Sequence, residues 1–465
     1  MRRFTYRRGA KELYPTRDAH CACALPALRS KPVTIRRRRA TRFSTTLALI
    51  AIALVVVGLA AVSRTLLARA APAPAMTVTT LPDGSLQVSD GAGFSAVFDR
   101  AQEGGLARLY DLQTDPGQSV NVGPAAGYTV FETYVNDGAG WANIGRGNAD
   151  LLEVVRSGSG SVVVHGVGSF MHEDGSGPVA GLKHETWTTL YAGGRVSIQR
   201  QLKTGASTVN LANFGGKAID VSTAAGWYGI YSGGPGDTSL GSGTNTWTGN
   251  GSEPWVGFRQ AGSGPGQSLG VGLSSWQGPD FGIADSDLRL LVGNVSPRSH
   301  VAQRTEGAVS LAANSTYSSW FGGWLSANLT MAGLGAEAGD YRNPGLSLST
   351  GSLAPSDSEP SQLTLSGGYN PASGSYVVNA AGGQLSGQFG FPAGVAVRYR
   401  PALKIQGWSA ASPRVQLGSS LLVAGTDYLY DYDAPSGTLR LVFLKDIASG
   451  APASGQLAAG TLSIT

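Results

Sequence analysis

The chain has 465 residues, of which 67 are Gly and 14% are charged, and its formal net charge is +5. This length leaves room for two or three domains with cores of their own, and the composition favours short strands and turns over long surface helices. The charge does not indicate nucleic acid binding, because residues 1–75 hold 15 Lys and Arg against 2 Asp and Glu, whereas residues 76–465 hold 20 against 28. We therefore expect an acidic body with no nucleic acid partner.

The N-terminal region is typical of an export segment. A basic tail (1–42) precedes an uncharged, hydrophobic helical stretch (43–63) and a linker rich in Ala and Pro (64–75). The stretch is either a signal that is cleaved after Ala70 or Ala75, or an uncleaved transmembrane anchor with its basic side in the cytoplasm. We expect an extracellular or cell-envelope protein, with the membrane as a partner if the segment is uncleaved.

Residues 1–32 show no periodicity, and we hypothesise that translation begins near Val33. Detection of a peptide from residues 1–32 in the native host would contradict this. Both cysteines, Cys21 and Cys23, lie in this tail, where a C-x-C spacing alone is a weak metal signal. We expect no cofactor, no metal, and no disulfide in the exported body.

From Met76 onward, short apolar runs alternate with turn signals. This pattern predicts an all-β fold with a large antiparallel β-sandwich over 76–340, in which only Leu329 to Ala338 could form a short helix. The segment from Ser232 to Trp255 is rich in Gly, Ser and Thr and carries two tryptophans. We interpret it as a long functional loop.

Pro and Ser concentrate in residues 341–362, which we interpret as a linker. Residues 363–465 again alternate strand-like runs with turns, and we predict a small Ig-like β-sandwich. Within it, "YLYDYD" and "TLRLVFL" should form a hairpin joined by Ala434 to Gly437, with the Asp- and Tyr-rich strand at a sheet edge.

Three segments, "GLARLYDLQTDP", "HETWTTLYAGGRVSIQRQLKT" and "SLAANSTYSSWFGGWL", resemble in kind and order the strands of galactose-mutarotase-like β-supersandwich domains. The resemblance covers residues 76 to about 340 and is a pattern of strands without a diagnostic motif. Such domains occur in mutarotases, in polysaccharide lyases and as appendages of glycoside hydrolases. The resemblance implies a carbohydrate ligand, but it carries over no catalytic set.

The stretch "FMHEDGSGPVAGLKHETW" contains two His-Glu pairs. If Gly193 and Gly194 form a two-residue turn, His184 faces Lys203. His184 then lies on a wet, polar face, where a solvent-exposed histidine is the plainer reading. Glu185 lies on the core face diagonal to Arg200, where an ion pair is expected.

The candidate catalytic residues are His172, His184 and Tyr231 for proton transfer, and Arg259 to neutralise a uronate carboxylate. The stacking of sugar rings on aromatic side chains suggests a substrate-binding set. Its members are Trp247, Trp255 and Tyr228. His165 could join the histidines around a metal, but no metal-ligand spacing is present. No spacing among Glu253, Asp280, Asp285 and Asp287 selects the carboxylate pair of a glycoside hydrolase.

Together these features indicate an exported or membrane-anchored β protein that acts on or binds a polysaccharide or cell-surface glycan. One form of this hypothesis is a lyase-like enzyme for uronate polymers. The alternative is a non-catalytic structural or adhesive protein of the cell surface. The two differ in whether His172, His184 and Tyr231 converge on one cleft.

Overall fold

The structure is a computed structural model, and the described part of the chain consists of residues 75–113, 115–222, 227–232, 237–239, 245–248, 256–260, 269–273, 281, 288–295, 298–305, 307–325, 339–359 and 362–465. The chain divides into two compact units, Met1–Arg69 and Ala70–Thr465. The first unit contains the predicted basic tail and the predicted hydrophobic segment, and all of it lies outside the described residues. The predicted helix at Leu329 to Ala338 also lies outside them. Among the helices that the described residues form, none has the length and apolar character needed to cross a membrane.

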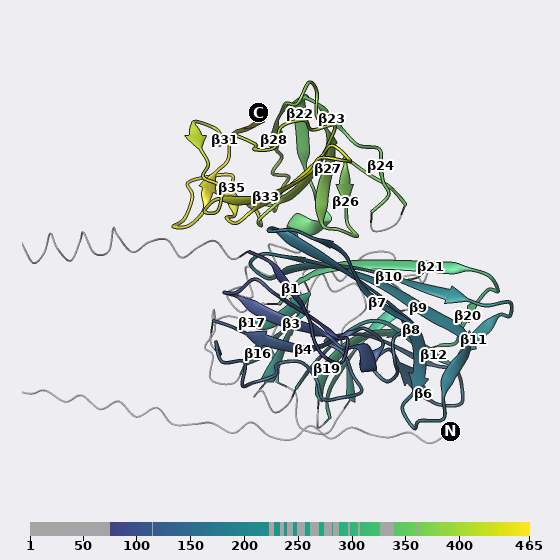
Figure 1. The fold of residues 1–465 in the computed structure, drawn as a ribbon. Helices are drawn as coiled ribbons and strands as arrows, with labels where there is room; N and C mark the ends of the chain where they lie inside the picture. Colours follow the sequence, from purple (N-terminus) through teal and green to yellow (C-terminus); the bar gives the residue numbers. More distant parts are fainter. Residues whose placement is uncertain are drawn as a thin grey trace, which may run out of the picture. The chain divides into compact units, whose positions relative to one another are not determined.

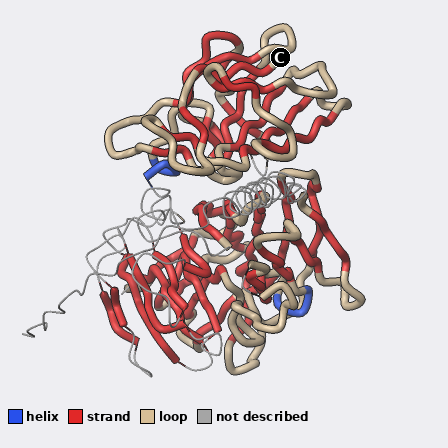
Figure 2. The backbone as a smooth tube through the Cα atoms, turned by 90° about the vertical axis from the view of Figure 1, so that its left-hand side faces the viewer, coloured by secondary structure: helices blue, strands red, loops and turns tan. Residues whose placement is uncertain are grey.

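The described residues are almost all strands and loops (Figure 2), which confirms the all-β prediction. A small sheet lies near the start of the second unit. It has the order β1 (Thr77–Thr80), β2 (Leu86–Ser89), β3 (Phe94–Phe98), β4 (Leu106–Asp111), and a short 3-10 helix, η1 (Arg100–Gln102), joins its last two strands.

A large sheet follows, antiparallel throughout (Figure 1). Within the described residues its order is β14 (Asp237–Ser239), β13 (Trp227–Ser232), β16 (Val256–Gln260), β17 (Leu269–Leu273), β21 (Thr316–Trp324), β10 (Arg195–Thr204), β9 (Pro178–Tyr191), β8 (Ser161–His172), β6 (Trp141–Asn143), β5 (Phe131–Asn136), β12 (Asn213–Ser222), β19 (Arg298–Thr305), β18 (Leu288–Val295), β15 (Asn245–Thr248), with β7 (Leu151–Ser157) paired to β8. A separate pair is formed by β11 (Val209–Leu211) and β20 (Val309–Leu311).

The C-terminal strands form sheets of their own. One sheet has the order β22 (Leu346–Thr350), β28 (Leu385–Phe389), β37 (Thr461–Ile464), β31 (Val415–Leu417), β32 (Ser420–Leu421). Another has the order β23 (Ser352–Leu353), β27 (Ser375–Asn379), β30 (Ala402–Gln406), β34 (Thr438–Phe443), β33 (Tyr428–Asp433), and β26 (Tyr369–Asn370) pairs with β27. Two smaller sheets consist of β24 (Ser356–Asp357) with β25 (Leu363–Thr364), and of β29 (Val397–Arg398), β35 (Ile447–Ala448) and β36 (Leu457–Ala458).

One hydrophobic core lies between the small sheet and the large sheet. Val88 and Phe94 of the small sheet belong to the same buried cluster as Ile198 and Phe321 of the large sheet. The alternation of apolar and polar residues explains this packing, because in β2 both Leu86 and Val88 point inward. A separate cluster of buried side chains forms the core of the C-terminal sheets.

The predicted C-terminal hairpin is confirmed. Strands β33 and β34 pair in register, with Asp433 opposite Thr438, and β33 lies at the edge of its sheet. The segment from 346 to 357 differs from the predicted linker, because its alternating side chains form β22, β23 and β24, which pair with later C-terminal strands. The parallel pair of β27 with β30 is part of this module, and its Ig-like character stays a prediction.

The predicted structureless loop from Ser232 to Trp255 contains two short strands. Strand β14 pairs with β13, and β15 pairs with β18. The prediction of one long loop was therefore wrong for these residues, because Thr and Trp in "NTWT" favour an extended backbone. The remainder of the segment lies outside the described residues.

Candidate functional site

Charged and aromatic side chains gather on one face of the large sheet around β5, β12 and β19. On the other face of these strands, Phe131 is opposite Ile219, and both lie in the core. We call the polar set the arginine–aromatic face. It consists of Tyr128, Tyr134, Trp141, Arg146, Glu173, Asp220, Arg298 and Arg304.

Strand β19, "RSHVAQRT", shows why these residues share a side. Arg298, His300 and Arg304 occupy alternate positions of the strand, and Val301 between them is buried in the core. His300 is the register partner of Asp220 on β12. Partners on antiparallel strands lie on the same face, so the basic side chains of β19 meet the carboxylate of β12.

Arg298 is the centre of the face. Its guanidinium Nη1 lies 2.9 Å from the Asp220 carboxylate and also donates a hydrogen bond to the Tyr134 hydroxyl. The same guanidinium lies over the ring of Tyr128, 3.9 Å from the ring centre. The Tyr134 hydroxyl in turn donates to Asp220. One cation is thus held by a carboxylate, a phenol and a ring face at once.

Burial shapes the ionisation of these groups. Asp220 is fully buried, and burial raises its pKa to about 6 although Arg298 and the Tyr134 hydroxyl act in the opposite direction. Burial and the charge of Asp220 also raise the pKa of Tyr134 well above its usual range, so its hydroxyl keeps its proton. Burial disfavours the charged form of Arg298, but Tyr134 and Asp220 raise its pKa on balance and keep it cationic.

Two further guanidinium groups flank this centre. Arg146 donates to the Tyr128 hydroxyl at 2.9 Å, and Arg304 lies over the Trp141 ring, 3.9 Å from its centre. Burial and the nearby Arg298 lower the pKa of Arg304 to about 10, so it remains charged near neutral pH. The side chains of these two arginines and of Tyr128 and Trp141 are partly exposed.

Glu173 completes the face. Its carboxylate accepts a hydrogen bond from the Asn143 side chain at 3.3 Å and lies 3.9 Å from Arg298. The face therefore presents three guanidinium groups and two carboxylates beside aromatic rings. This arrangement can bind a carboxylate-bearing sugar, because guanidinium groups pair with carboxylates through two parallel hydrogen bonds and rings stack on the apolar faces of sugars.

The structure places His172 beside Glu173 but outside the arginine–aromatic face. Its ring nitrogens contact the Gly177 carbonyl at 2.9 Å and the Asp137 carboxylate at 3.1 Å. The hydrogen bond to Asp137 raises the pKa of His172. These contacts close the turn that follows β8, which gives His172 a structural role in this conformation.

His184 lies in the interior, and the prediction of a wet face for it was wrong. The turn between β9 and β10 contains Ala192 as well as Gly193 and Gly194, both of which have positive φ. His184 therefore pairs with Leu202 instead of Lys203. A shift of one residue reverses every side chain of a strand, so the prediction put His184 on the opposite face.

The interior position of His184 determines its ionisation. Its side chain is 1% exposed, contacts the Phe170 ring edge to face, and has no hydrogen-bond partner among the described residues. Burial, with the charges of Arg200 and Lys183, lowers its pKa to about 3. His184 is opposite Gly168, which precedes His172 by four residues, or about 13 Å of strand. The structure does not bring the two histidines within hydrogen-bond reach.

Glu185 also lies on the other face of its strand from the core face on which it was predicted. It contacts His165 at 2.8 Å and pairs with Lys203, and the predicted ion pair with Arg200 is not formed. Arg200 instead donates to Thr133 and to the Phe131 carbonyl. His165 stacks on Trp187, with ring centres 4.7 Å apart, and also contacts Glu153. Within the described residues no group of three or more acidic, His or Cys side chains is arranged to hold a metal ion.

The other predicted site residues are placed only by their backbone or lie outside the described residues. Tyr231 is opposite Gly257 on β16, and Arg259 is opposite Gly229 on β13, so the two occupy diagonal positions on adjacent strands. Trp247 is opposite Leu291 at the far end of the sheet order. Tyr228 lies on β13, and Trp255 falls outside the described part of the chain. Their assignment to a site stays a prediction.

Sequence reasoning missed the arginine–aromatic face. Its members come from segments more than 150 residues apart, and they meet only because β5, β12 and β19 are adjacent in the sheet. One local signal was available: Arg298, His300 and Arg304 at even spacing in "RSHVAQRT" indicate a charged strand face.

Comparisons with known proteins found likenesses of fold. A putative aldose 1-epimerase from Klebsiella pneumoniae subsp. pneumoniae aligns with a TM-score of 0.32 at 11% identity, over 56% of this chain and 85% of its own. A protein from Synechocystis sp. PCC 6803 aligns with a TM-score of 0.31 at 8% identity, over 55% of this chain and 96% of its own.

A polysaccharide lyase aligns with a TM-score of 0.27 at 8% identity over 85% of this chain, which spans 46% of the lyase. Aldose 1-epimerases and polysaccharide lyases are among the proteins in which the domain that the strand pattern resembles occurs. No family model matches the chain, and no curated protein matches it either.

Proposed function

We propose that this protein binds an acidic polysaccharide through the arginine–aromatic face. The observation that carries the proposal is the position of Arg298, whose guanidinium lies over the Tyr128 and Tyr134 rings. Arg146 lies over the same Tyr128 ring, and Arg304 lies over the Trp141 ring. Stacking fixes a guanidinium plane and leaves its edge available to hydrogen-bond a carboxylate. Carbohydrate is also the ligand class that the resemblance of the strands implies.

Uronate residues fit the charge of the face better than neutral sugars. Three guanidinium groups face two carboxylates, and Asp220, with a pKa of about 6, is partly protonated in mildly acidic solution. The face therefore has a net positive charge within an otherwise acidic body. The basic and hydrophobic N-terminus supports export or membrane anchoring, which would bring this face to an extracellular glycan.

A β-eliminating lyase is the second candidate, and the Tyr134–Asp220 hydrogen bond favours it. In such a reaction the Tyr134 oxygen would take the proton α to the uronate carboxylate as its own proton passes to Asp220. The bond from the β carbon to the glycosidic oxygen would break, and the departing oxygen would take a proton from Tyr134, which would recover its own from Asp220. Arg298 would neutralise the charge that develops on the carboxylate. The predicted residues His172, His184, Tyr231 and Arg259 form no part of this scheme.

The test is binding of the purified full chain to polygalacturonate, alginate and hyaluronan, with dextran as the neutral comparison. We expect retention on the acidic polymers that weakens with salt, and none on dextran. Equal retention on dextran, or none on any acidic polymer, would contradict the proposal. Ultraviolet absorbance of an unsaturated product from the same mixtures separates the lyase from a binding protein.

A further inference from the structure

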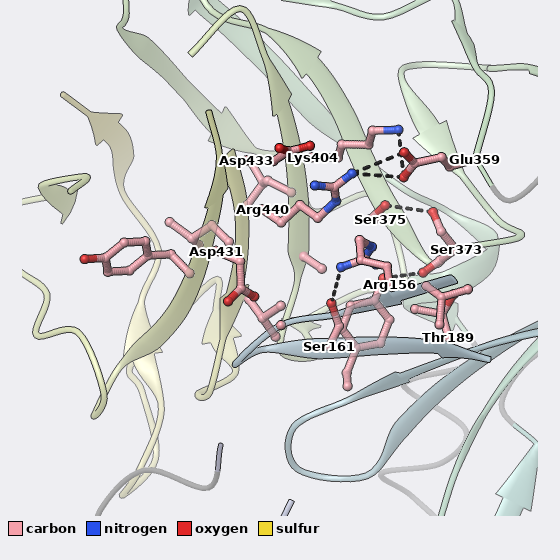
Figure 3. Close-up of a pocket in the computed structure, with 18 of the residues that line it drawn as sticks. Arg156, Ser161, Thr189, Glu359, Ser373, Ser375, Lys404, Asp431, Asp433 and Arg440 are labelled. Atoms are coloured by element: carbon pink, nitrogen blue, oxygen red, sulfur yellow. Dashed lines mark hydrogen bonds and ion pairs between the residues drawn. The ribbon is translucent and has the colours of Figure 1, made fainter. Parts of the chain in front are cut away.

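A cavity lies between the large sheet and the C-terminal sheets, within the compact unit Ala70–Thr465 (Figure 3). Its volume is about 780 Å³, within the range of pockets that bind small molecules. Residues from β7, β8 and β9 line one side, and residues from β27, β30, β33 and β34 line the other. None of these residues belongs to the arginine–aromatic face.

Direct contacts fix the two sides of the cavity. The Asp431 carboxylate accepts a hydrogen bond from the Ser159 backbone at 2.7 Å and another from the Gly160 backbone at 3.2 Å. The Tyr191 hydroxyl donates to the Ser373 carbonyl. The walls are thus held by hydrogen bonds that cross between the sheets.

Arg156 differs from the other cations of the cavity. Lys404 lies 2.7 Å from the Asp357 carboxylate, and Arg440 lies 3.1 Å from Glu359. Arg156 donates to the Ser161 hydroxyl at 3.0 Å (Figure 3), and it forms no ion pair with another described residue. Its buried Nε also has no partner among the described residues. Arg156 is half-buried, and Glu359 and Asp431 favour its charged form only at longer range. Its guanidinium is therefore able to pair with the carboxylate of a ligand.

Thr189 provides a second, independent observation. Its side chain is 1% exposed and lines the same cavity, and its hydroxyl has no hydrogen-bond partner among the described residues. Buried hydroxyl groups are nearly always hydrogen-bonded. A ligand hydroxyl in the cavity would satisfy it, which points to a polyhydroxylated molecule.

The acidic residues of the cavity limit the charge of the ligand. Asp357, Glu359, Asp431 and Asp433 line it together with the three cations. These carboxylates would repel a dianion such as sulfate or a phosphate ester more strongly than a monoanion, whereas a single carboxylate needs only one guanidinium that is not paired with an acid. The carboxylates can also accept hydrogen bonds from sugar hydroxyl groups.

We propose that this cavity binds a monosaccharide or disaccharide unit that carries one carboxylate, with the carboxylate on Arg156 and a ring hydroxyl on Thr189. Its evidence does not depend on the arginine–aromatic face. The cavity would hold a single uronate unit, while the sheet face would hold an extended polymer.

Titration calorimetry on the full chain with D-glucuronate, D-galacturonate, glucose and inorganic sulfate tests the inference. We expect both uronates to bind and glucose and sulfate to bind at least about tenfold more weakly. Arg156→Gln should weaken uronate binding about tenfold. Arg414→Gln removes the same charge from an exposed site on the C-terminal module and should change nothing.

Thr189→Val is the second variant, because valine has the same shape without the hydroxyl. It should weaken uronate binding and leave the melting temperature of the free protein unchanged or higher, since an unpartnered hydroxyl is removed. A purely structural Thr189 would instead give a lower melting temperature.

Arg304→Gln separates this inference from the sheet-face proposal. Uronate binding that survives Arg304→Gln and is lost with Arg156→Gln supports the cavity. Uronate binding that is lost with Arg304→Gln but not with Arg156→Gln overturns it and leaves the sheet face intact. Absence of monosaccharide binding, or equal affinity for glucose or sulfate, also overturns the cavity inference, whatever the polymer does.

Discussion

Replacing Arg298 with glutamine should destabilise the protein in a way that depends on pH. Asp220 is fully buried, and Arg298 is its charged partner at 2.9 Å. Removing one member of a buried pair costs roughly 3–5 kcal/mol. Because Arg298 itself is 15% exposed, we expect a value near the lower end, about 3 kcal/mol at about pH 8.

The pH dependence follows from the pKa of Asp220. Burial raises it to about 6 in the folded protein, above about 3.9 in the unfolded chain. The folded state therefore holds a proton that the unfolded chain releases, and the contribution of Asp220 to stability falls as pH rises through this window. Arg298 lowers the pKa of Asp220, so this pKa should be higher in Arg298→Gln. The free energy of unfolding of the variant should therefore continue to fall above about pH 6, by at most about 1.4 kcal/mol per pH unit.

Urea unfolding followed by tryptophan fluorescence measures this effect. We expect Arg298→Gln to cost about 3 kcal/mol at about pH 8 and about 1 kcal/mol at about pH 5, the latter from the lost contact with the Tyr128 ring. In an Asp220→Asn background the cost should be about 1 kcal/mol at both pH values. An equal cost at both pH values in the Asp220 protein, or the same cost in the Asn background, would refute this reasoning.

Three further predictions concern the neighbourhood of the two His-Glu pairs. Gly168→Ala should lower the free energy of unfolding in urea by about 1–3 kcal/mol, because the added methyl group would collide with the Glu103 carboxylate and the His184 ring. Gly140→Ala, whose methyl group would make only ordinary contacts, is the control. A loss as small as that of the control would contradict the clash. Burial raises the pKa of Glu103 to about 7, so the stability of the wild-type protein should decrease as pH rises from about 4.5 to 7. In Glu103→Gln the melting temperature should depend less on pH over this range. A melting temperature that depends on pH as in the wild type would contradict the raised pKa. The hydrogen bond to Asp137 raises the pKa of His172, so NMR titration should find a lower His172 pKa in Asp137→Asn, and an identical value in both proteins would refute the contact.

Much of the strand content could be predicted from the sequence, but the register could not. The runs around Val163 and Ile198 are strands as expected, because alternating and β-branched residues favour extended backbone. The Gly193-Gly194 turn was predicted one residue too short. Since the side-chain period of a strand is two, that single residue moved His184 from a predicted wet surface to the core.

The candidate site was beyond sequence reasoning for a different reason. Tyr134, Asp220 and Arg298 meet because β5, β12 and β19 are neighbours in the sheet, and the order of strands in a large antiparallel sheet is not encoded in local patterns. Asp220 lies in an otherwise apolar stretch that indicates a buried strand, and its partner Arg298 lies 78 residues away in the sequence. Only the alternation of charges in β19 was visible in advance.

The doubled His-Glu motif illustrates how strand geometry divides neighbouring residues. Glu173 joins the arginine–aromatic face while His172 closes a turn. Glu185 pairs with Lys203 while His184 is buried against Phe170. In each pair the histidine and the glutamate have different surroundings, so neither pair acts as a unit.

The most direct test of the central claim compares Arg304→Gln with Arg108→Gln for binding of the full chain to polygalacturonate. Both variants lose one positive charge, but Arg304 lies over Trp141 on the arginine–aromatic face, whereas Arg108 is on β4 of the small sheet. We expect the dissociation constant to rise about tenfold for Arg304→Gln, as for loss of a charge-assisted hydrogen bond, and to stay unchanged for Arg108→Gln. Equal weakening by both variants, or by neither, would contradict polysaccharide binding at this face.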